Sequence, residues 1–286
     1  MVACIPSRGY LICCIERTGS NLLAEALLQT ERAGRPLEYF SPVLQHTPWM
    51  RGILGDATML SGFANILRAG STSNGVFGAK LHWVHVRYLA RALSSPGGEL
   101  PVAEPGAYLK LLAQLPELMP TAEFLELLRA RAGDRAHFTA VYKLFEAKVP
   151  ELRVIWLRRQ NMVARAISHY RALHSKVWSR SKSAADATAE IVPEFDPARI
   201  HQLYGLGLFQ EESWQWLFGE LGVTPHCLTY EELAAEYEPT VRGVLKFMGL
   251  DQPVGSIGTV SLARQADAVS QEWELRYREL SADAGL

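Results

Sequence analysis

The sequence lacks the features that mark membrane, secreted and nucleic-acid-coating proteins. No apolar run reaches the ~18 residues that a membrane span needs. The apolar stretch at residues 10–15 is too short for a secretory signal, and Glu16 and Arg17 follow it at once. Lys and Arg number 29 against 30 Asp and Glu, which gives a net charge of -1. That balance argues against a nucleic-acid coat or a polybasic membrane anchor.

Cysteine is also scarce, with only Cys4, Cys13, Cys14 and Cys227 in 286 residues. There is no C-x-x-C pair and no Cys/His group with zinc spacing, so we expect no metal site. Cys13 and Cys14 lie in an apolar run that predicts a strand, and their side chains should point to opposite faces. Buried free thiols in a reducing cytoplasm are the expectation.

The turn at residues 17–21 lacks both the first Gly and the Lys of a Walker A loop, which argues against a Mg-ATP machine. It is still suited to an anion, because a helix begins near Ser20 and helix N-termini carry unpaired N–H groups. Gly19 lets the backbone approach a ligand, Thr18 and Asn21 add side-chain donors, and Arg17 adds a permanent charge. An ordinary tight turn with a capping Ser fits these residues equally well.

Alternating strand and helix patterns predict an α/β fold with a P-loop-like central parallel sheet flanked by helices. Short apolar runs predict strands at residues 10–15, 76–81, 153–157 and 226–229. Helical spacing predicts helices at about 20–29, 49–67, 121–131, 161–175, 198–218 and 230–248, and a last helix from an N-cap at Ser270 to about Leu280. Residues 94–106 read as irregular, and residues 178–197 are rich in Ser and Ala. With no repeat or clear boundary, residues 1–286 are expected to form a single domain.

Charge is segregated along the chain. Residues 152–185 hold eight cations and no Asp or Glu, so the rest has 29 − 8 = 21 cations against 30 anions. A solvated helix face usually carries both signs. Arg158 and Arg159 end the third predicted strand, and ligands of open α/β sheets bind at strand carboxyl ends. Two strand ends with anion-binding chemistry indicate a ligand with two anionic groups. The sulfuryl donor 3′-phosphoadenosine 5′-phosphosulfate (PAPS) fits this description.

Five segments, in order, resemble motifs of the bacterial PAPS-dependent carbohydrate sulfotransferases of the trehalose 2-sulfotransferase and NodH-like type. The first, Arg-Thr-Gly-Ser-Asn-Leu-Leu, resembles the family's 5′-phosphosulfate loop, with Thr18 and Asn21 where the family commonly has Ser and Thr. The others resemble its Gly-x-Pro-x-Glu-[FY]-Phe, Gly-Val-[WF]-Gly-x-Lys-Leu-x-Trp, 3′-phosphate and C-terminal segments. The five segments are residues 17–23, 34–40, 75–83, 159–168 and 264–278.

The resemblance implies a sulfotransferase fold and transfer of the sulfuryl group of PAPS to a hydroxyl of a carbohydrate or glycolipid, with PAP as product and no metal. It implies that Glu38 is the general base. Arg17, Thr18, Gly19, Ser20 and Asn21 would hold the 5′-phosphosulfate. Arg159 and Ser168 would hold the 3′-phosphate, Lys80 would assist at the sulfuryl group, and Arg264 and Gln265 would close over the nucleotide. A homodimer is a family expectation.

Substrate choice is assigned to residues 84–150 and 179–260, which match the family poorly and are taken as variable helical and loop insertions. Aromatic and histidine side chains near the motifs are candidates for acceptor binding, although core packing explains the aromatic ones equally well. These candidates are Tyr39, Phe40, Trp83, His169 and Trp178. Two other functions stay open: a non-catalytic protein that binds PAP or PAPS, and a P-loop nucleotide kinase.

Overall fold

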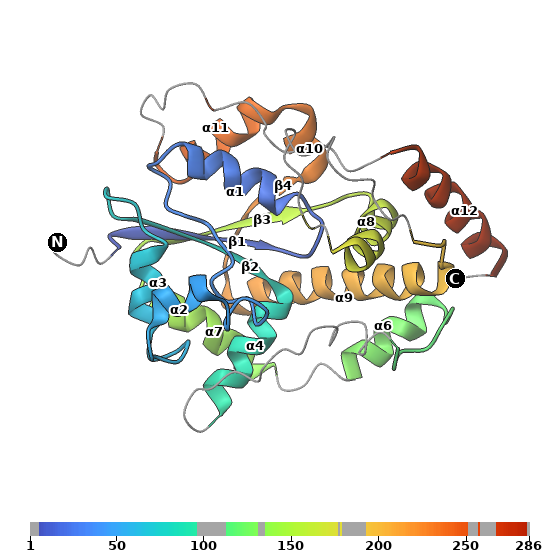
Figure 1. Ribbon diagram of the computed structural model, residues 1–286, viewed down its shortest axis with the longest axis horizontal. Helices are drawn as coiled ribbons and strands as arrows, with labels where there is room; N and C mark the ends of the chain where they lie inside the picture. Colours follow the sequence, from blue (N-terminus) through green and yellow to red (C-terminus); the bar gives the residue numbers. More distant parts are fainter. Residues whose placement is uncertain are drawn as a thin grey trace.

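Four parallel strands form the central sheet of the protein, in the order β2-β1-β3-β4 (Figure 1). The structure is a computed structural model and describes residues 6–95, 113–130, 135–176, 178, 193–250, 257 and 267–284. The strands are β1 (Arg8–Cys14), β2 (Val76–His82), β3 (Leu152–Arg158) and β4 (His226–Thr229). All four lie where the sequence predicts them. Cys14 pairs with His82 and Cys13 with Trp156, so the carboxyl ends of β1, β2 and β3 share one edge of the sheet.

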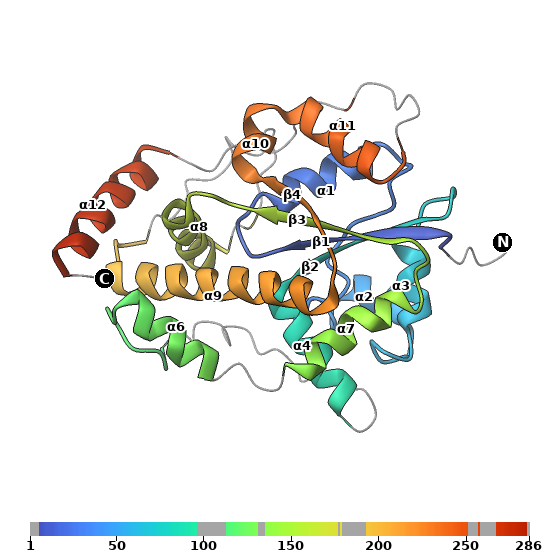
Figure 2. The same cartoon turned by 180° about the vertical axis from the view of Figure 1, so that it is seen from behind.

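Helices cover both faces of the sheet, which confirms the predicted α/β class (Figures 1 and 2). One face carries α1 (Ser20–Gln29) and α11 (Tyr237–Phe247). The other carries α2 (Pro48–Leu54), α3 (Phe63–Ala69), α4 (Trp83–Ser94), α7 (Ala136–Glu146) and α9 (Pro197–Leu221). A strand sends successive side chains to opposite faces. Cys13 accordingly packs in one hydrophobic cluster and Cys14 in the other, as predicted.

A third hydrophobic cluster lies beyond the carboxyl ends of the strands. It is formed by α6 (Thr121–Ala130), α8 (Met162–Ser175), one end of α9, and α12 (Ala268–Ala284). The short helix α10 (Tyr230–Ala235) follows β4 directly. None of the helices in the described ranges is long and apolar enough to cross a bilayer.

Several helix predictions are corrected by the structure. The helix expected at 49–67 is two helices, because the backbone at Gly55 turns to φ 61° after α2. The helix expected at 230–248 also divides, since Glu236 leaves the helical region at φ −127° between α10 and α11. Ser270 lies inside α12 and is not its N-cap; its N–H donates to the Asp267 carboxylate at 2.9 Å. Helices α4 and α7 were not predicted.

The ranges taken as variable insertions contain core elements. The range 179–260 includes β4, which completes the described sheet, and α9, whose Trp214 and Phe218 pack beneath it. Of the cysteines, Cys13 and Cys14 are buried free thiols, whereas Cys227 is exposed, contrary to the expectation. Cys4, most of residues 94–106 and most of residues 178–197 lie outside the described residues.

Candidate functional site

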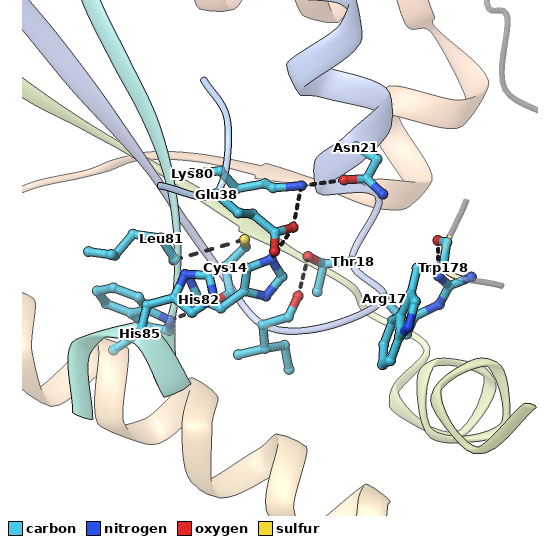
Figure 3. Close-up of polar contacts among 12 residues, drawn as sticks. Cys14, Arg17, Thr18, Asn21, Glu38, Lys80, Leu81, His82, His85 and Trp178 are labelled. Atoms are coloured by element: carbon cyan, nitrogen blue, oxygen red, sulfur yellow. Dashed lines mark hydrogen bonds and ion pairs between the residues drawn. The ribbon is translucent and has the colours of Figure 1, made fainter. Parts of the chain in front are cut away.

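The turn between β1 and α1 presents an uncapped helix N-terminus at the carboxyl edge of the sheet (Figure 3). Gly19 occupies the N-cap position at φ 83°, and no side chain caps the helix. Arg17 also has a positive φ, of 69°. The first N–H groups of a helix have no acceptor within it, so this turn suits a phosphate or sulfate oxygen. A Cβ at Gly19 would lie 2.6 Å from the ring of Tyr230, which explains why glycine is needed.

Side chains of the turn make hydrogen bonds within the protein. Thr18 is fully buried, and its hydroxyl donates to the carbonyl of Ile15 at 2.9 Å, so it is not the side-chain donor that the sequence suggested. Ser20 is buried as well. The Asn21 side chain accepts a hydrogen bond from the ammonium of Lys80. The ligand-facing donors of this turn are therefore chiefly backbone N–H groups.

Glu38 and Lys80 form an ion pair beside the turn, as Figure 3 shows. Lys80 Nζ lies 2.7 Å from Glu38 Oε1, and the Lys80 side chain is 5% exposed against 31% for Glu38. A backbone hydrogen bond brings the two residues together, because the Lys80 N–H donates to the carbonyl of Leu37 at 3.0 Å. The same ammonium contacts both Glu38 and Asn21, so one cation links the carboxylate to the helix N-terminus.

The electrostatics of the pair keep Glu38 ionised. Burial raises the pKa of the Glu38 carboxyl, but the positive charges of Lys80 and His82 lower it by more. The net pKa lies well below the usual 4.5. Glu38 is therefore a carboxylate at neutral pH.

Arg17 connects the turn to α8. Its Nε donates to the hydroxyl of Ser168 at 2.9 Å, and its Nη1 donates to the carbonyl of Trp178. The guanidinium of Arg159 donates to the carbonyl of Arg17 at 3.1 Å. The predicted 5′- and 3′-anion sites are thus in direct contact through Arg17, Arg159 and Ser168.

Arg159 retains unused donor capacity. Its guanidinium lies 4.7 Å from the ring centroid of Tyr230, and its buried Nε has no hydrogen-bond partner within the described ranges. Burial lowers the pKa of Arg159, although Tyr230 and Glu231 oppose that shift. A buried guanidinium N–H without an acceptor is costly, so an anionic oxygen would stabilise it. These residues therefore fit the separate 3′-phosphate of PAPS.

Two of the proposed sugar-stacking rings are in the hydrophobic core. Phe40 is fully buried against Phe63 and Phe145, and Trp83 is 2% exposed against Phe138 and Trp214. Neither ring presents a face to a ligand, so the structure corrects this part of the prediction.

The remaining acceptor candidates differ in exposure. Tyr39 is 1% exposed, stacks on Trp49, and donates its hydroxyl to the Arg35 carbonyl at 2.9 Å. His169 is buried, and burial lowers its pKa well below 6.5, with Arg165 and Arg17 adding to the effect. Trp178 is 44% exposed, and its ring lies 5.8 Å from that of His169. Trp178 alone among the five candidates presents substantial surface next to the anion-binding residues.

Other predicted site features lie elsewhere. Arg264 and Gln265 fall outside the described residues. Within the described ranges, no three or more His, Cys, Asp or Glu side chains gather in a metal-binding arrangement.

Sequence reasoning considered His82 as a possible base but set it aside as a surface or packing residue, whereas its Nε2 lies 3.5 Å from Glu38 Oε1. The sequence does contain a pattern that could have identified His82. Residues two apart in a strand share a face, and His82 follows Lys80 at that spacing. Sequence reasoning missed Tyr230, which packs against the turn from α10, and Trp214, whose indole N–H donates to the Cys14 carbonyl at 2.9 Å. No local pattern connects either residue to a turn some 200 positions earlier.

The fold and the site define an α/β protein with an uncapped helix N-terminus, an arginine pair and an ionised carboxylate at one sheet edge. The family model of the Stf0 sulphotransferases matches residues 9–98 and 109–280. The chain therefore belongs to the Stf0 sulphotransferase family, which confirms the resemblance seen in its motifs.

Two curated relatives match nearly the whole chain. A trehalose 2-sulfotransferase of Mycobacterium tuberculosis (strain Erdman) is 26% identical over 98% of this chain and 97% of its own length. A trehalose 2-sulfotransferase of Mycolicibacterium smegmatis is 27% identical over 97% of each chain. A crystal structure of a sulfotransferase from Alicyclobacillus acidocaldarius aligns with a TM-score of 0.43 and 15% identity, covering 98% of this chain and 91% of that one.

Proposed function

We propose that this sulfotransferase moves the sulfuryl group of PAPS to a hydroxyl of a carbohydrate, with Glu38 as general base. The observation that carries the proposal is the contact of Lys80 with both Glu38 and Asn21. It holds an ionised carboxylate beside the helix N-terminus that would bind the phosphosulfate. The relatives named as trehalose 2-sulfotransferases support a disaccharide as the first acceptor to test.

The chain's own residues supply binding and charge compensation. The uncapped N–H groups at the start of α1 and the Arg17 guanidinium hold the 5′-phosphosulfate. Arg159 and Ser168 hold the 3′-phosphate. PAPS supplies an activated sulfuryl group and a phosphate leaving group. The same donors stabilise the negative charge that develops on that leaving group.

Glu38 takes the proton of the acceptor hydroxyl. Its side chain is 31% exposed, enough for a hydroxyl to reach it, while Lys80 is almost completely covered. Lys80 fixes the carboxylate at Oε1 and keeps it ionised. A positioned general base typically contributes roughly 10²–10⁴-fold to a rate.

Calorimetric titration with PAP, alongside Mg-ATP, tests the nucleotide site. We expect micromolar PAP binding that weakens about tenfold or more in Arg159→Ala, since hydrogen bonds to charged groups are worth ~1.5–3 kcal/mol. Arg129→Ala is the matched control, because Arg129 is an exposed arginine that pairs with Glu212 away from the turn. A folded wild type that does not bind PAP would exclude the proposal.

Mass spectrometry of trehalose incubated with enzyme and PAPS tests transfer. The wild type should add one sulfuryl group per product molecule, and Glu38→Gln should slow turnover about 100-fold or more while still binding PAP. Binding without turnover on a panel of sugars would favour a non-catalytic PAP-binding protein. Tighter binding of Mg-ATP than of PAP would favour a nucleotide kinase.

A further inference from the structure

His82 is buried at the carboxyl end of β2, next to the proposed base. It is the last residue of the strand, and its side chain is 8% exposed. Residues two apart in a strand point the same way, so His82 and Lys80 project together. Figure 3 shows both side chains converging on the Glu38 carboxylate.

Both side chains make their closest contact with the same carboxylate oxygen. Lys80 Nζ is 2.7 Å from Glu38 Oε1, and His82 Nε2 is 3.5 Å from it. Oε1 is therefore the oxygen that both cations contact most closely. A carboxylate held at one oxygen presents the other in a fixed direction, which is what proton transfer from a hydroxyl requires.

The His82 imidazole has few partners apart from Glu38. Its side chain joins a capping box with the backbone of His85 at the start of α4, and Cys14 lies beside it. Burying an imidazole costs free energy unless hydrogen bonds or a nearby charge compensate. Glu38 is the carboxylate within ion-pair distance, so the pair explains why a histidine is stable at this position.

Titratable groups from several neighbouring elements surround His82. Cys14 on β1 and Glu38 favour its charged form and, against the effect of burial, raise its pKa well above 6.5. Lys80 and the buried histidines His85 on α4 and His169 on α8 also lie nearby. Burial and the charge of His82 lower the pKa of His85 to about 3, so His85 is neutral. His85 Nδ1 accepts the His82 N–H at 3.3 Å, which fixes the start of α4.

We infer that His82 is a positioning residue for Glu38: its imidazolium, together with Lys80, holds Oε1 so that Oε2 faces the acceptor hydroxyl. The inference rests on the proposed function for the identity of the base. The ion pair itself is a property of the folded chain and does not depend on any ligand. The two statements can therefore be tested separately.

Proton NMR titration of the histidine ring signals tests the ion pair without any turnover. The His82 signal is assigned by triple-resonance NMR of the labelled wild-type protein. In the wild type we expect it to titrate above pH 6.5, and in Glu38→Gln about one pH unit lower or more, because a neighbouring carboxylate has been removed. Glu38→Gln keeps the imidazole in place, so this arm holds even if His82→Gln fails to fold. An unchanged His82 titration in Glu38→Gln would overturn the inference.

The pH dependence of kcat tests the positioning role. The wild-type kcat should fall as His82 loses its proton above pH 6.5, because Oε1 then keeps only Lys80. His82→Gln should have a lower kcat without that inflection, with an acid limb about one pH unit higher, since the Glu38 carboxyl has lost a nearby positive charge. His226→Gln is the control, because His226 lies on β4, separated from β2 by β1 and β3.

The outcomes separate the two proposals. An inflection that persists in His82→Gln would overturn the positioning role. The His82 titration could shift in Glu38→Gln even though the protein transfers no sulfuryl group. That result would overturn both the positioning role and the proposed function, and would leave only an ion pair.

Discussion

Arg17 Nε donates to Ser168 Oγ at 2.9 Å, although 151 residues separate the two in the sequence. The bond ties the turn after β1 to the middle of α8 (Figure 3 shows Arg17). Arg159 ties the same turn to the end of β3 through the Arg17 carbonyl. Two proposed anion-binding regions that lie far apart in the sequence are therefore in direct contact, and a change in one is expected to affect the other.

Replacement of Ser168 by alanine should weaken PAP binding about tenfold or more. The hydroxyl would be lost to the ligand, and the Arg17 guanidinium would lose the acceptor that orients it. Calorimetry with PAP measures the effect. Ser94→Ala is the control, since the Ser94 hydroxyl donates only to the Ala90 carbonyl within α4. Equal affinity of Ser168→Ala and wild type would show that Ser168 does not contact the nucleotide.

Replacement of Gly19 by alanine should destabilise the protein more than the same change at Gly222. Both glycines have left-handed backbones, at φ 83° and φ 64°, so each variant incurs strain of ~1–2 kcal/mol. Only at Gly19 would the new methyl group meet a neighbour, the Tyr230 ring at 2.6 Å. Thermal unfolding should show a larger drop for Gly19→Ala, with loss of PAP binding. Equal losses in the two variants would mean that Tyr230 yields easily.

Replacement of Trp178 by alanine should raise the KM for the sugar acceptor several-fold and change PAP affinity little. Its ring is exposed beside His169, whereas the group that Arg17 contacts is the Trp178 carbonyl, which alanine retains. A sugar ring that stacks on an exposed indole makes a large apolar contact. Trp49→Ala is the matched control, because Trp49 is 41% exposed and packs on Tyr39. A raised KM in Trp49→Ala alone would move the acceptor site to that side of the molecule.

Replacement of Asp267 by asparagine should destabilise the protein near neutral pH, and the difference should shrink in acid. Partial burial raises the pKa of Asp267, but hydrogen bonds from Arg171 at 2.6 Å and from the Ser270 N–H lower it by more, to about 2. A folded-state pKa below the ordinary 3.8 means that the contribution is present above about pH 4 and is lost as pH falls toward 2.

Urea unfolding of wild type and Asp267→Asn between pH 6 and pH 2 measures this difference. Asparagine still caps α12, so the comparison isolates the charge that Arg171 contacts. A wild-type advantage that is constant over the whole range would assign the effect to the shape of the side chain.

The sheet and the turn between β1 and α1 were predictable because local patterns specify them. The apolar run that ends at Ile15 and the helix that begins at Ser20 leave a polar turn between them, and the structure has these boundaries within one or two residues. The resemblance to the family's 3′-phosphate segment likewise grouped Arg159 with Ser168, and in the structure both residues contact Arg17. In each instance the relevant residues are neighbours in the sequence or in adjacent elements.

The predictions failed for side chains whose burial or hydrogen bonding depends on tertiary contacts. Nothing local distinguishes Trp83, which is in the core, from Trp178, which is 44% exposed. Both are single tryptophans beside polar residues. Thr18 has a hydroxyl that could bind an anion, but in the folded chain that hydroxyl donates its hydrogen bond to the Ile15 carbonyl. The Glu38–Lys80–His82 group depends on the chain after α1 lying along β2, a pairing that only the folded backbone reveals.

The residues of the proposed donor site and the proposed base occupy different parts of the chain. The former lie on the β1–α1 and β3–α8 units, whereas Glu38 belongs to the connection between α1 and α2. The Lys80 side chain touches both parts, through Asn21 and Glu38. For protein engineering, this means that an α1–α2 connection taken from a homologue would have to keep the contacts of Glu38 with Lys80 and His82. It would also have to keep the packing of Phe40 on Phe145, which holds the segment against the core.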